Sequence, residues 1–281
     1  MASFPRIPDL LTTANLCCGV GSILLASQGQ LTLACWLVFA GAFFDVLDGL
    51  AARALGGGSE LGKQLDSLAD MVTFGVAPAF ILWSGIGSIS VFMFMQNEGK
   101  DLIPIGTYTA DGIPGVVVSH IALWVIVLSI PVASAWRLAK FNIDTRQTGG
   151  FLGLPTPANA LFYASLGLVV GSPNDMYTSY LLTGIGQGMI PTLSEHGLLN
   201  LIWPWGLCIA SAGLSILMLS ELPLPSLKFK HFKWQGNQVI YMLGGSGVVL
   251  VALYGMLAVP LILVLYILSP LWGRVFGKGV N

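Results

Sequence analysis

Apolar segments long enough to cross a lipid bilayer follow one another along the whole chain. A helical span needs about 20 mainly apolar residues to cross a hydrocarbon core of about 30 Å. Of the 281 residues, 55% are hydrophobic and 9% are charged, whereas about 25% of residues are charged in a typical soluble domain. Backbone groups in lipid must find their hydrogen bonds within the protein, so the spans are expected to be helices. The sequence therefore predicts an all-α, polytopic membrane bundle.

Eight spans can be placed between polar, glycine-containing or proline-containing connections. They lie at about residues 11–27, 31–55, 61–86, 116–139, 151–170, 198–219, 239–257 and 259–272. We expect residues 1–220 to form one membrane core. Residues 221–281 are expected to supply a basic cytoplasmic connector and two additional transmembrane helices.

The distribution of basic residues predicts the orientation of these spans. An even number of spans places both termini on one side of the membrane. Of the 12 lysine and arginine residues, all but Lys100 then fall on the side of the termini, and such an excess marks cytoplasmic loops. We therefore expect an inner-membrane protein whose termini face the cytoplasm. The formal net charge of -1 gives no indication of a nucleic-acid partner.

Four aspartates lie in two of the predicted spans, and the residues around them are almost wholly apolar. Near the centre of a bilayer an aspartate costs roughly 2.5–3.5 kcal/mol on insertion scales. Ordinary solvated acids at helix ends are therefore a poor explanation, and a cation or a polar cavity is a better one. The four residues are Asp45, Asp48, Asp66 and Asp70.

The spacing of these aspartates brings them onto two facing helix surfaces. Within each pair the two residues are three or four positions apart, so they share one face of a helix. The glycines at 56–58 predict a turn between the two helices, and Ser59 is a typical N-cap for the second. The helices should return antiparallel, so that the acidic faces meet. Carboxylate oxygens are the ligands that Mg²⁺ and Mn²⁺ prefer.

Residues next to the aspartates leave space and add one positive charge. Gly49, Ala52 and Gly62 have little or no side chain on the same side, which leaves room for a ligand beside the metal. Arg53 offers a planar set of donors at the rim, which suits phosphate oxygens.

This pattern resembles the signature of the CDP-alcohol phosphotransferase family. The matching positions, at the spacing of the family, are Asp45, Asp48, Gly49, Ala52, Arg53, Gly62, Asp66 and Asp70. The resemblance implies that the four aspartates ligate two divalent ions, Mg²⁺ or Mn²⁺, and that Asp70 also acts as the general base. It implies that Gly49, Ala52, Arg53 and Gly62 shape the site for the nucleotide and its phosphates.

Polar residues at the start of the first span lie on the same membrane side as the aspartates. They are Thr12, Thr13 and Asn15. Hydrogen bonding between helices explains them, and so does contact with the phosphates or nucleotide of a ligand. We keep Thr13 and Asn15 as candidate nucleotide-binding or phosphate-binding residues.

A second polar group ends the fourth span. Arg137 and Lys140 are three residues apart, and Asn142 follows. These residues fit the usual cytoplasmic excess of positive charge and anchoring to lipid headgroups. They fit equally a pocket for a phosphate or for a substrate carboxylate, and we keep all three as candidates for that role.

Three further segments resemble the phosphatidylserine synthase branch of the family, namely 66–79, 137–142 and 153–158. The resemblance covers residues 8–170. It implies that the protein forms a homodimer and is surrounded by membrane lipids. Its substrates would be CDP-diacylglycerol and L-serine, and its products phosphatidylserine and CMP, with the active site facing the cytoplasm. Lys140 stands where relatives often carry arginine. The compact ammonium group of lysine therefore replaces the planar guanidinium group, which could form two parallel hydrogen bonds.

Three other functions fit the sequence less well. An acceptor such as inositol phosphate or glycerol phosphate would require a denser cluster of basic side chains. The chain has few further lysine and arginine residues, which favours serine. A Mg²⁺-dependent prenyltransferase also uses aspartate pairs, but the pattern of Gly49, Ala52, Arg53 and Gly62 argues against it. In an ion transporter the acids usually lie near the bilayer midplane on broken helices, whereas here they lie toward one end of their spans.

Overall fold

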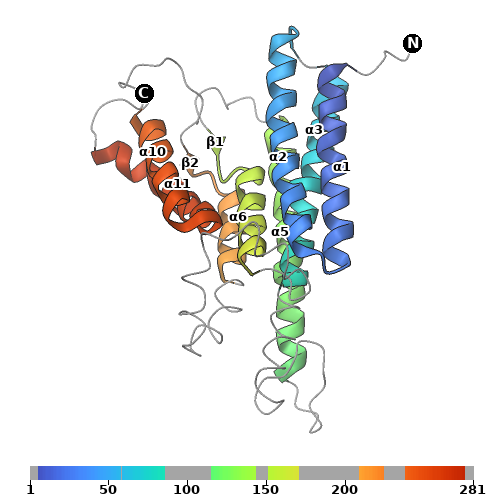
Figure 1. Cartoon of the computed structure of the whole chain (residues 1–281), viewed down its shortest axis with the longest axis vertical. Helices are drawn as coiled ribbons and strands as arrows, with labels where there is room; N and C mark the ends of the chain where they lie inside the picture. Colours follow the sequence, from blue (N-terminus) through green and yellow to red (C-terminus); the bar gives the residue numbers. More distant parts are fainter. Residues whose placement is uncertain are drawn as a thin grey trace.

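A computed structural model describes residues 6–57, 59–85, 115–143, 151–170, 209–224 and 238–275. This part of the chain is mainly helical (Figure 1). Four helices in it are long and apolar enough to cross a membrane. They are α1 (Ile7–Ser27), α2 (Leu31–Ala54), the continuous helix Glu60–Gly85, and Trp124–Ile143 within α5 (Gly115–Ile143). These helices fit the prediction of a mainly helical membrane protein, while the total of eight spans stays a prediction.

The remaining elements are shorter. Three apolar helical segments cover Ile209–Leu219, Gln238–Tyr254 and Ala258–Pro270. After α5 the described residues also form β1 (Phe151–Leu152), α6 (Thr156–Val170), β2 (Pro223–Leu224), α10 (Gln238–Tyr254), η3 (Gly255–Leu257) and α11 (Ala258–Val275). The basic part of the predicted connector, at 225–237, and the first part of the predicted sixth span lie outside the described residues.

The first three long helices form a bundle on one side of the molecule (Figure 1). The Ser22 hydroxyl donates to the Ala34 carbonyl at 2.8 Å near the turn that joins α1 to α2, as expected for an antiparallel pair. The Ser84 hydroxyl donates to the Ala26 carbonyl at 2.7 Å, so the C-terminal ends of α1 and Glu60–Gly85 lie together. Glu60–Gly85 therefore runs parallel to α1 and antiparallel to α2, as the glycine turn predicts.

Glu60–Gly85 is not uniform along its length. It begins as α3 (Glu60–Asp70) and continues as the π-helical segment η1 (Met71–Val76). Wider turns of this kind often occur next to functional sites. Thr73 in η1 donates its hydroxyl to the Asn15 carbonyl at 3.0 Å. A Cβ atom at Gly41 would lie 2.6 Å from Thr73 Cγ2. Small residues thus allow three helices to meet closely at Thr73, as is common in membrane bundles.

Helix α5 packs antiparallel to Glu60–Gly85. A Cβ atom at Gly75 would lie 3.0 Å from the Cβ of Ser134, and the side chains of Ser67 and Asn142 form a hydrogen bond. Each helix therefore advances by eight residues between these two contacts, in opposite directions. By this register, position 137 of α5 lies level with the residues that follow Asp70.

A two-stranded antiparallel sheet ties the start of α6 to the end of Ile209–Leu219. Phe151 pairs with Leu224. Gly153 follows β1 with a φ of 74°, and a Cβ atom there would lie 2.6 Å from the Ser220 carbonyl oxygen. This left-handed conformation and close approach require glycine.

Two buried clusters hold the helices together. One joins α1, α2, η1 and α6 and includes Phe74 and Ala164. The other joins α5, α6, Ile209–Leu219, α10 and α11 and includes Tyr163 and Tyr266. The C-terminal helices are thus packed into the same protein body, beside α6 (Figure 1).

Candidate metal centre and substrate site

Three carboxylates converge between α2 and α3. One carboxylate oxygen from each of Asp45, Asp48 and Asp66 lies within 4.8 Å of the other two. Asp48 is buried and the other two are partly buried. Asp70, one turn beyond Asp66, interacts electrostatically with all three. Negative charges this close repel strongly where water is partly excluded. A donor set of carboxylate oxygens therefore fits a divalent cation.

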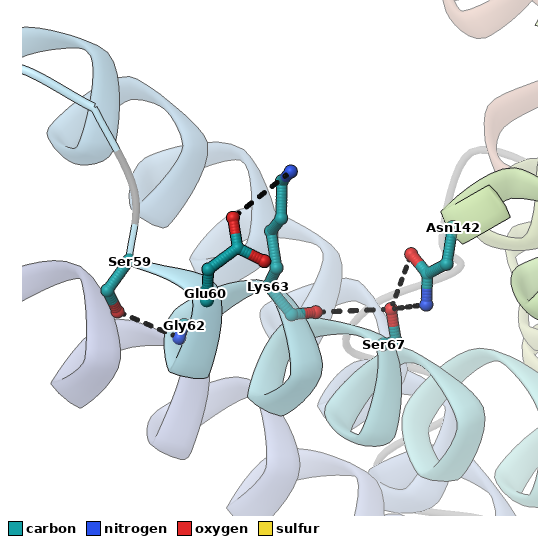
Figure 2. Close-up of polar contacts among 6 residues, drawn as sticks. All are labelled: Ser59, Glu60, Gly62, Lys63, Ser67 and Asn142. Carbon is teal, nitrogen blue, oxygen red and sulfur yellow. Dashed lines mark hydrogen bonds and ion pairs between the residues drawn. The ribbon is translucent and has the colours of Figure 1, made fainter. Parts of the chain in front are cut away.

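The turn between α2 and α3 brings these residues together. Gly56 and Gly57 have φ values of 89° and 108°, which suit glycine and end α2. The backbone amide of Gly62 donates to the Ser59 hydroxyl oxygen at 2.9 Å, as Figure 2 shows. The predicted turn and the predicted N-cap at Ser59 are both confirmed. The last two turns of α2 therefore face the first turns of α3.

Two side chains of α1 hold the carboxylates. The Thr12 hydroxyl donates to Asp48 Oδ2 at 2.7 Å, and Asn15 Nδ2 donates to Asp70 Oδ1 at 3.3 Å. Both residues are buried. Asn15 Oδ1 is a buried atom without a hydrogen-bond partner in the described part of the chain. Thr13 is exposed, and its hydroxyl donates to a backbone carbonyl of its own helix at 2.7 Å.

The small residues of the motif have different surroundings. A Cβ atom at Gly49 would lie 4.0 Å from Nη2 of Arg53, so the exposed guanidinium lies beside this position. Ala52 is partly buried. A Cβ atom at Gly62 would lie 3.0 Å from Asp9 Oδ1, where α1 approaches α3. The sequence predicts glycine at position 62 as a means to leave room for a ligand. Close packing of α1 against α3 is a second reason for glycine there.

The three candidate residues of α5 lie in three different environments. Arg137 is 8% exposed and interacts electrostatically with Asp70, in agreement with the helix register. Its Nε atom is buried without a hydrogen-bond partner among the described residues. Lys140 is exposed. Asn142 is also exposed and donates from Nδ2 to the Ser67 hydroxyl oxygen at 2.9 Å (Figure 2). Asn142 therefore fastens the end of α5 to the helix that carries Asp66.

Two buried polar residues on α6 and α11 were not among the predicted site residues. Asn159, on α6, is fully buried, and both polar atoms of its amide lack a hydrogen-bond partner in the described structure. A feature of the sequence that could have indicated Asn159 is its position directly after the segment 153–158. Tyr266, on α11, interacts electrostatically with Arg137. No local pattern marks it, because it lies in an apolar run and more than 120 residues from Arg137.

Comparison with known sequences agrees with the signature. Residues 6–190 match the sequence model of the CDP-alcohol phosphatidyltransferase family. The protein belongs to this family. The match includes the four aspartates, the turn between α2 and α3, and the whole of α5 and α6.

Three curated relatives carry the name CDP-diacylglycerol–serine O-phosphatidyltransferase. The protein from Mycobacterium leprae is 31% identical over 230 residues, which are 79% of this chain and 58% of the relative. The protein from Helicobacter pylori strain J99 is 38% identical over 156 residues, which are 55% of this chain and 54% of the relative. The protein from Bacillus subtilis is 30% identical over 227 residues, which are 81% of this chain and 91% of the relative. The chain thus spans little more than half of the first two relatives and most of the third.

Proposed function

We propose that the protein transfers the phosphatidyl group of CDP-diacylglycerol to the hydroxyl of L-serine, which gives phosphatidylserine and CMP. The observation that carries the proposal is the convergence of Asp45, Asp48 and Asp66 beside Asp70 on membrane-length helices. The names of the three relatives support the choice of serine as the acceptor.

The reaction is an attack by the serine hydroxyl on the phosphorus that carries diacylglycerol. A new P–O bond forms to serine, the P–O bond to CMP breaks, and the serine proton passes to a base. We assign two divalent ions, Mg²⁺ or Mn²⁺, to the carboxylates of Asp45, Asp48, Asp66 and Asp70. Bound there, these ions would neutralise the pyrophosphate and the charge that develops on the leaving CMP.

Asp70 is the residue we propose as general base. Among the four carboxylates it is the one held by Asn15, and it interacts with Arg137. A hydrogen bond to one oxygen restricts the orientation of the carboxylate, and a base must be positioned before its basicity matters. The buried Arg137 would bind the serine carboxylate or the reacting phosphate through its planar donors. Lys140 and Asn142 are further candidates for this side of the site.

The nucleotide side of the site is proposed to lie toward the turn between α2 and α3. Gly49, Ala52 and Gly62 would leave room there, and the exposed Arg53 would contact phosphate oxygens. Thr13 and Asn15 of α1 are further candidates for contact with the nucleotide or its phosphates. The acyl chains would extend sideways between helices into the bilayer.

We propose that the protein is a homodimer in the cytoplasmic membrane with eight spans and with the site facing the cytoplasm. The excess of lysine and arginine on the side of the termini supports this orientation. CDP-linked substrates are cytoplasmic, which agrees with it. The division into a core at 1–220 and an additional helix pair within 221–281 belongs to the same proposal.

The decisive experiment measures incorporation of radiolabelled serine by the purified protein in detergent with CDP-diacylglycerol. Parallel reactions contain Mg²⁺, Mn²⁺ or EDTA. We expect metal-dependent phosphatidylserine and an equal amount of CMP. Release of CMP only with another alcohol, such as inositol phosphate or glycerol phosphate, would refute serine as the acceptor. If folded protein releases no CMP with any alcohol, the transferase proposal fails and cation flux in liposomes becomes the next measurement.

A further inference from the structure

A buried asparagine near the start of α6 has an amide without a partner. Asn159 is 0% exposed, and neither its Oδ1 nor its Nδ2 has a hydrogen-bond partner in the part of the chain that the structure describes. Its backbone N–H donates to the Pro155 carbonyl at 3.2 Å and is satisfied. Burying an amide without hydrogen bonds lowers stability, so we looked for a ligand that would supply the missing partners.

The level of Asn159 in the bundle follows from the packing of α6. A Cβ atom at Gly167 would lie 3.0 Å from Ile81 Cγ2, so the C-terminal ends of α6 and Glu60–Gly85 lie together. Helix α6 also packs against η1, and Ala160 shares a buried cluster with Phe74. The two helices therefore run parallel. Asn159, eight residues before Gly167, is level with the middle of η1.

Arg137 lies at the same level on α5. Helices α5 and α6 pack against each other, and Ala133 and Tyr163 belong to one buried cluster. Arg137 is four residues after Ala133 and Asn159 is four residues before Tyr163, so each continues the face of the clustered residue. Both steps lead toward the aspartates, because α5 runs antiparallel and α6 parallel to Glu60–Gly85. Nε of Arg137 is also buried without a partner among the described residues.

This level is about one helical turn from the acidic centre. The close approach of Gly41 to Thr73 marks the level of η1 on α2. Asp45 comes four residues after Gly41, and Asp70 comes three residues before Thr73. Both aspartates therefore lie one turn, or about 5.4 Å, closer to the turn between α2 and α3. An acceptor whose hydroxyl meets Asp70 can reach the level of Asn159 with its other groups.

We propose that Asn159 is a specificity-determining residue of the acceptor site, whose Oδ1 accepts a hydrogen bond from the ammonium group of serine while Arg137 binds the serine carboxylate. Arginine has donors only, whereas an amide has an acceptor oxygen and a donor nitrogen. A zwitterionic amino acid needs both kinds of partner, and Nδ2 of Asn159 can donate to the carboxylate. This inference deepens the proposed function and rests on serine being the acceptor.

The first measurement uses the wild-type protein with CDP-diacylglycerol, Mg²⁺ and radiolabelled serine. Unlabelled serine and 3-hydroxypropionate, which is serine without its amino group, are compared as competitors. We expect 3-hydroxypropionate to compete at least about tenfold more weakly, because it lacks the charged donor and leaves the amide of Asn159 unpaired. Equal competition by the two compounds would overturn the proposal without any variant.

The second measurement uses Asn159→Leu, which removes both polar atoms and nearly preserves the volume of the side chain. We expect the KM for serine to rise at least about tenfold, and the preference for serine over 3-hydroxypropionate to be lost. The KM for CDP-diacylglycerol should stay close to wild type. Without serine, the thermal midpoint should equal or exceed that of the wild type, because an unpaired polar group has left the interior. A lower midpoint with an unchanged KM would show that the amide is structural, for example through a buried water, and would overturn the proposal.

The matched control is Ser165→Ala, on the same helix. Ser165 is also buried, but its hydroxyl donates to the Phe162 carbonyl at 2.8 Å, and its loss should leave the KM for serine unchanged. If the wild-type protein transfers serine and Asn159→Leu keeps the wild-type KM, the role of Asn159 alone fails. If the wild-type protein releases CMP only with another alcohol, the proposed function fails, and binding of the serine ammonium group by Asn159 fails with it.

Discussion

The hydroxyl of Thr12 offers the sharpest test of the metal centre. It is buried and donates to Asp48 Oδ2 at 2.7 Å, so Thr12→Val removes one donor from a carboxylate while nearly preserving the shape of the side chain. Hydrogen bonds to charged groups contribute about 1.5–3 kcal/mol. Loss of a group that orients a metal ligand typically lowers metal affinity or activity by about 10-fold to 100-fold. The two estimates agree in size.

The assay follows serine transfer while Mg²⁺ or Mn²⁺ is titrated. For Thr12→Val we expect the metal concentration at half-maximal activity to rise at least tenfold, in line with the loss of an orienting contact. The control is Ser22→Ala, which deletes another buried hydroxyl of α1, one that bonds a backbone carbonyl of α2 at 2.8 Å. It should keep the wild-type metal requirement. An unchanged metal requirement in Thr12→Val, or the same rise in both variants, would refute the idea that this contact positions a metal ligand.

Three further predictions concern the proposed base, the contact between α3 and α5, and the close approach at Gly62. Asp70→Asn should abolish turnover and largely retain CDP-diacylglycerol binding, and transfer at a near wild-type rate would exclude Asp70 as the base. Ser67→Ala and Asn142→Ala should lower the thermal midpoint by similar amounts, because both break the 2.9 Å bond between α3 and α5; a wild-type midpoint in both would contradict this. Gly62→Ala should destabilise the protein by about 1 kcal/mol or more, since the new Cβ lies 3.0 and 3.1 Å from side-chain oxygens. Gly213→Ala, whose Cβ would contact nothing within 4 Å, should be neutral or stabilising by about the same amount in a denaturation assay.

The acidic centre could be predicted because local rules determine it. Helical spacing places each pair of aspartates on one face, and the glycine turn with its Ser59 cap brings the two faces together. Each rule depends on residues close in sequence. The same reasoning could not separate Thr12 from Thr13, because the choice between facing Asp48 and facing outward depends on how α1 is rotated against α2.

The polar residues at the end of α5 differ in burial, which their spacing does not predict. Arg137 and Lys140 are three residues apart and are candidates for one pocket by spacing, yet one is buried and the other exposed. Neighbouring helices cover only part of the face, and a spacing rule carries no information about where that cover ends. Asn142 lies beyond the covered part and bonds to Ser67 instead.

The contribution of the C-terminal helices lies entirely in tertiary packing. Composition predicts that α10 and α11 are apolar helices, and an apolar helix can serve equally for lipid contact, assembly or the protein core. The burial of Tyr266 and Ser269 distinguishes these cases for α11, which packs against α6. A helix devoted to lipid contact would have no need of buried polar side chains. Polar groups that are buried away from water need partners inside the protein, so this part of α11 belongs to the packed protein interior.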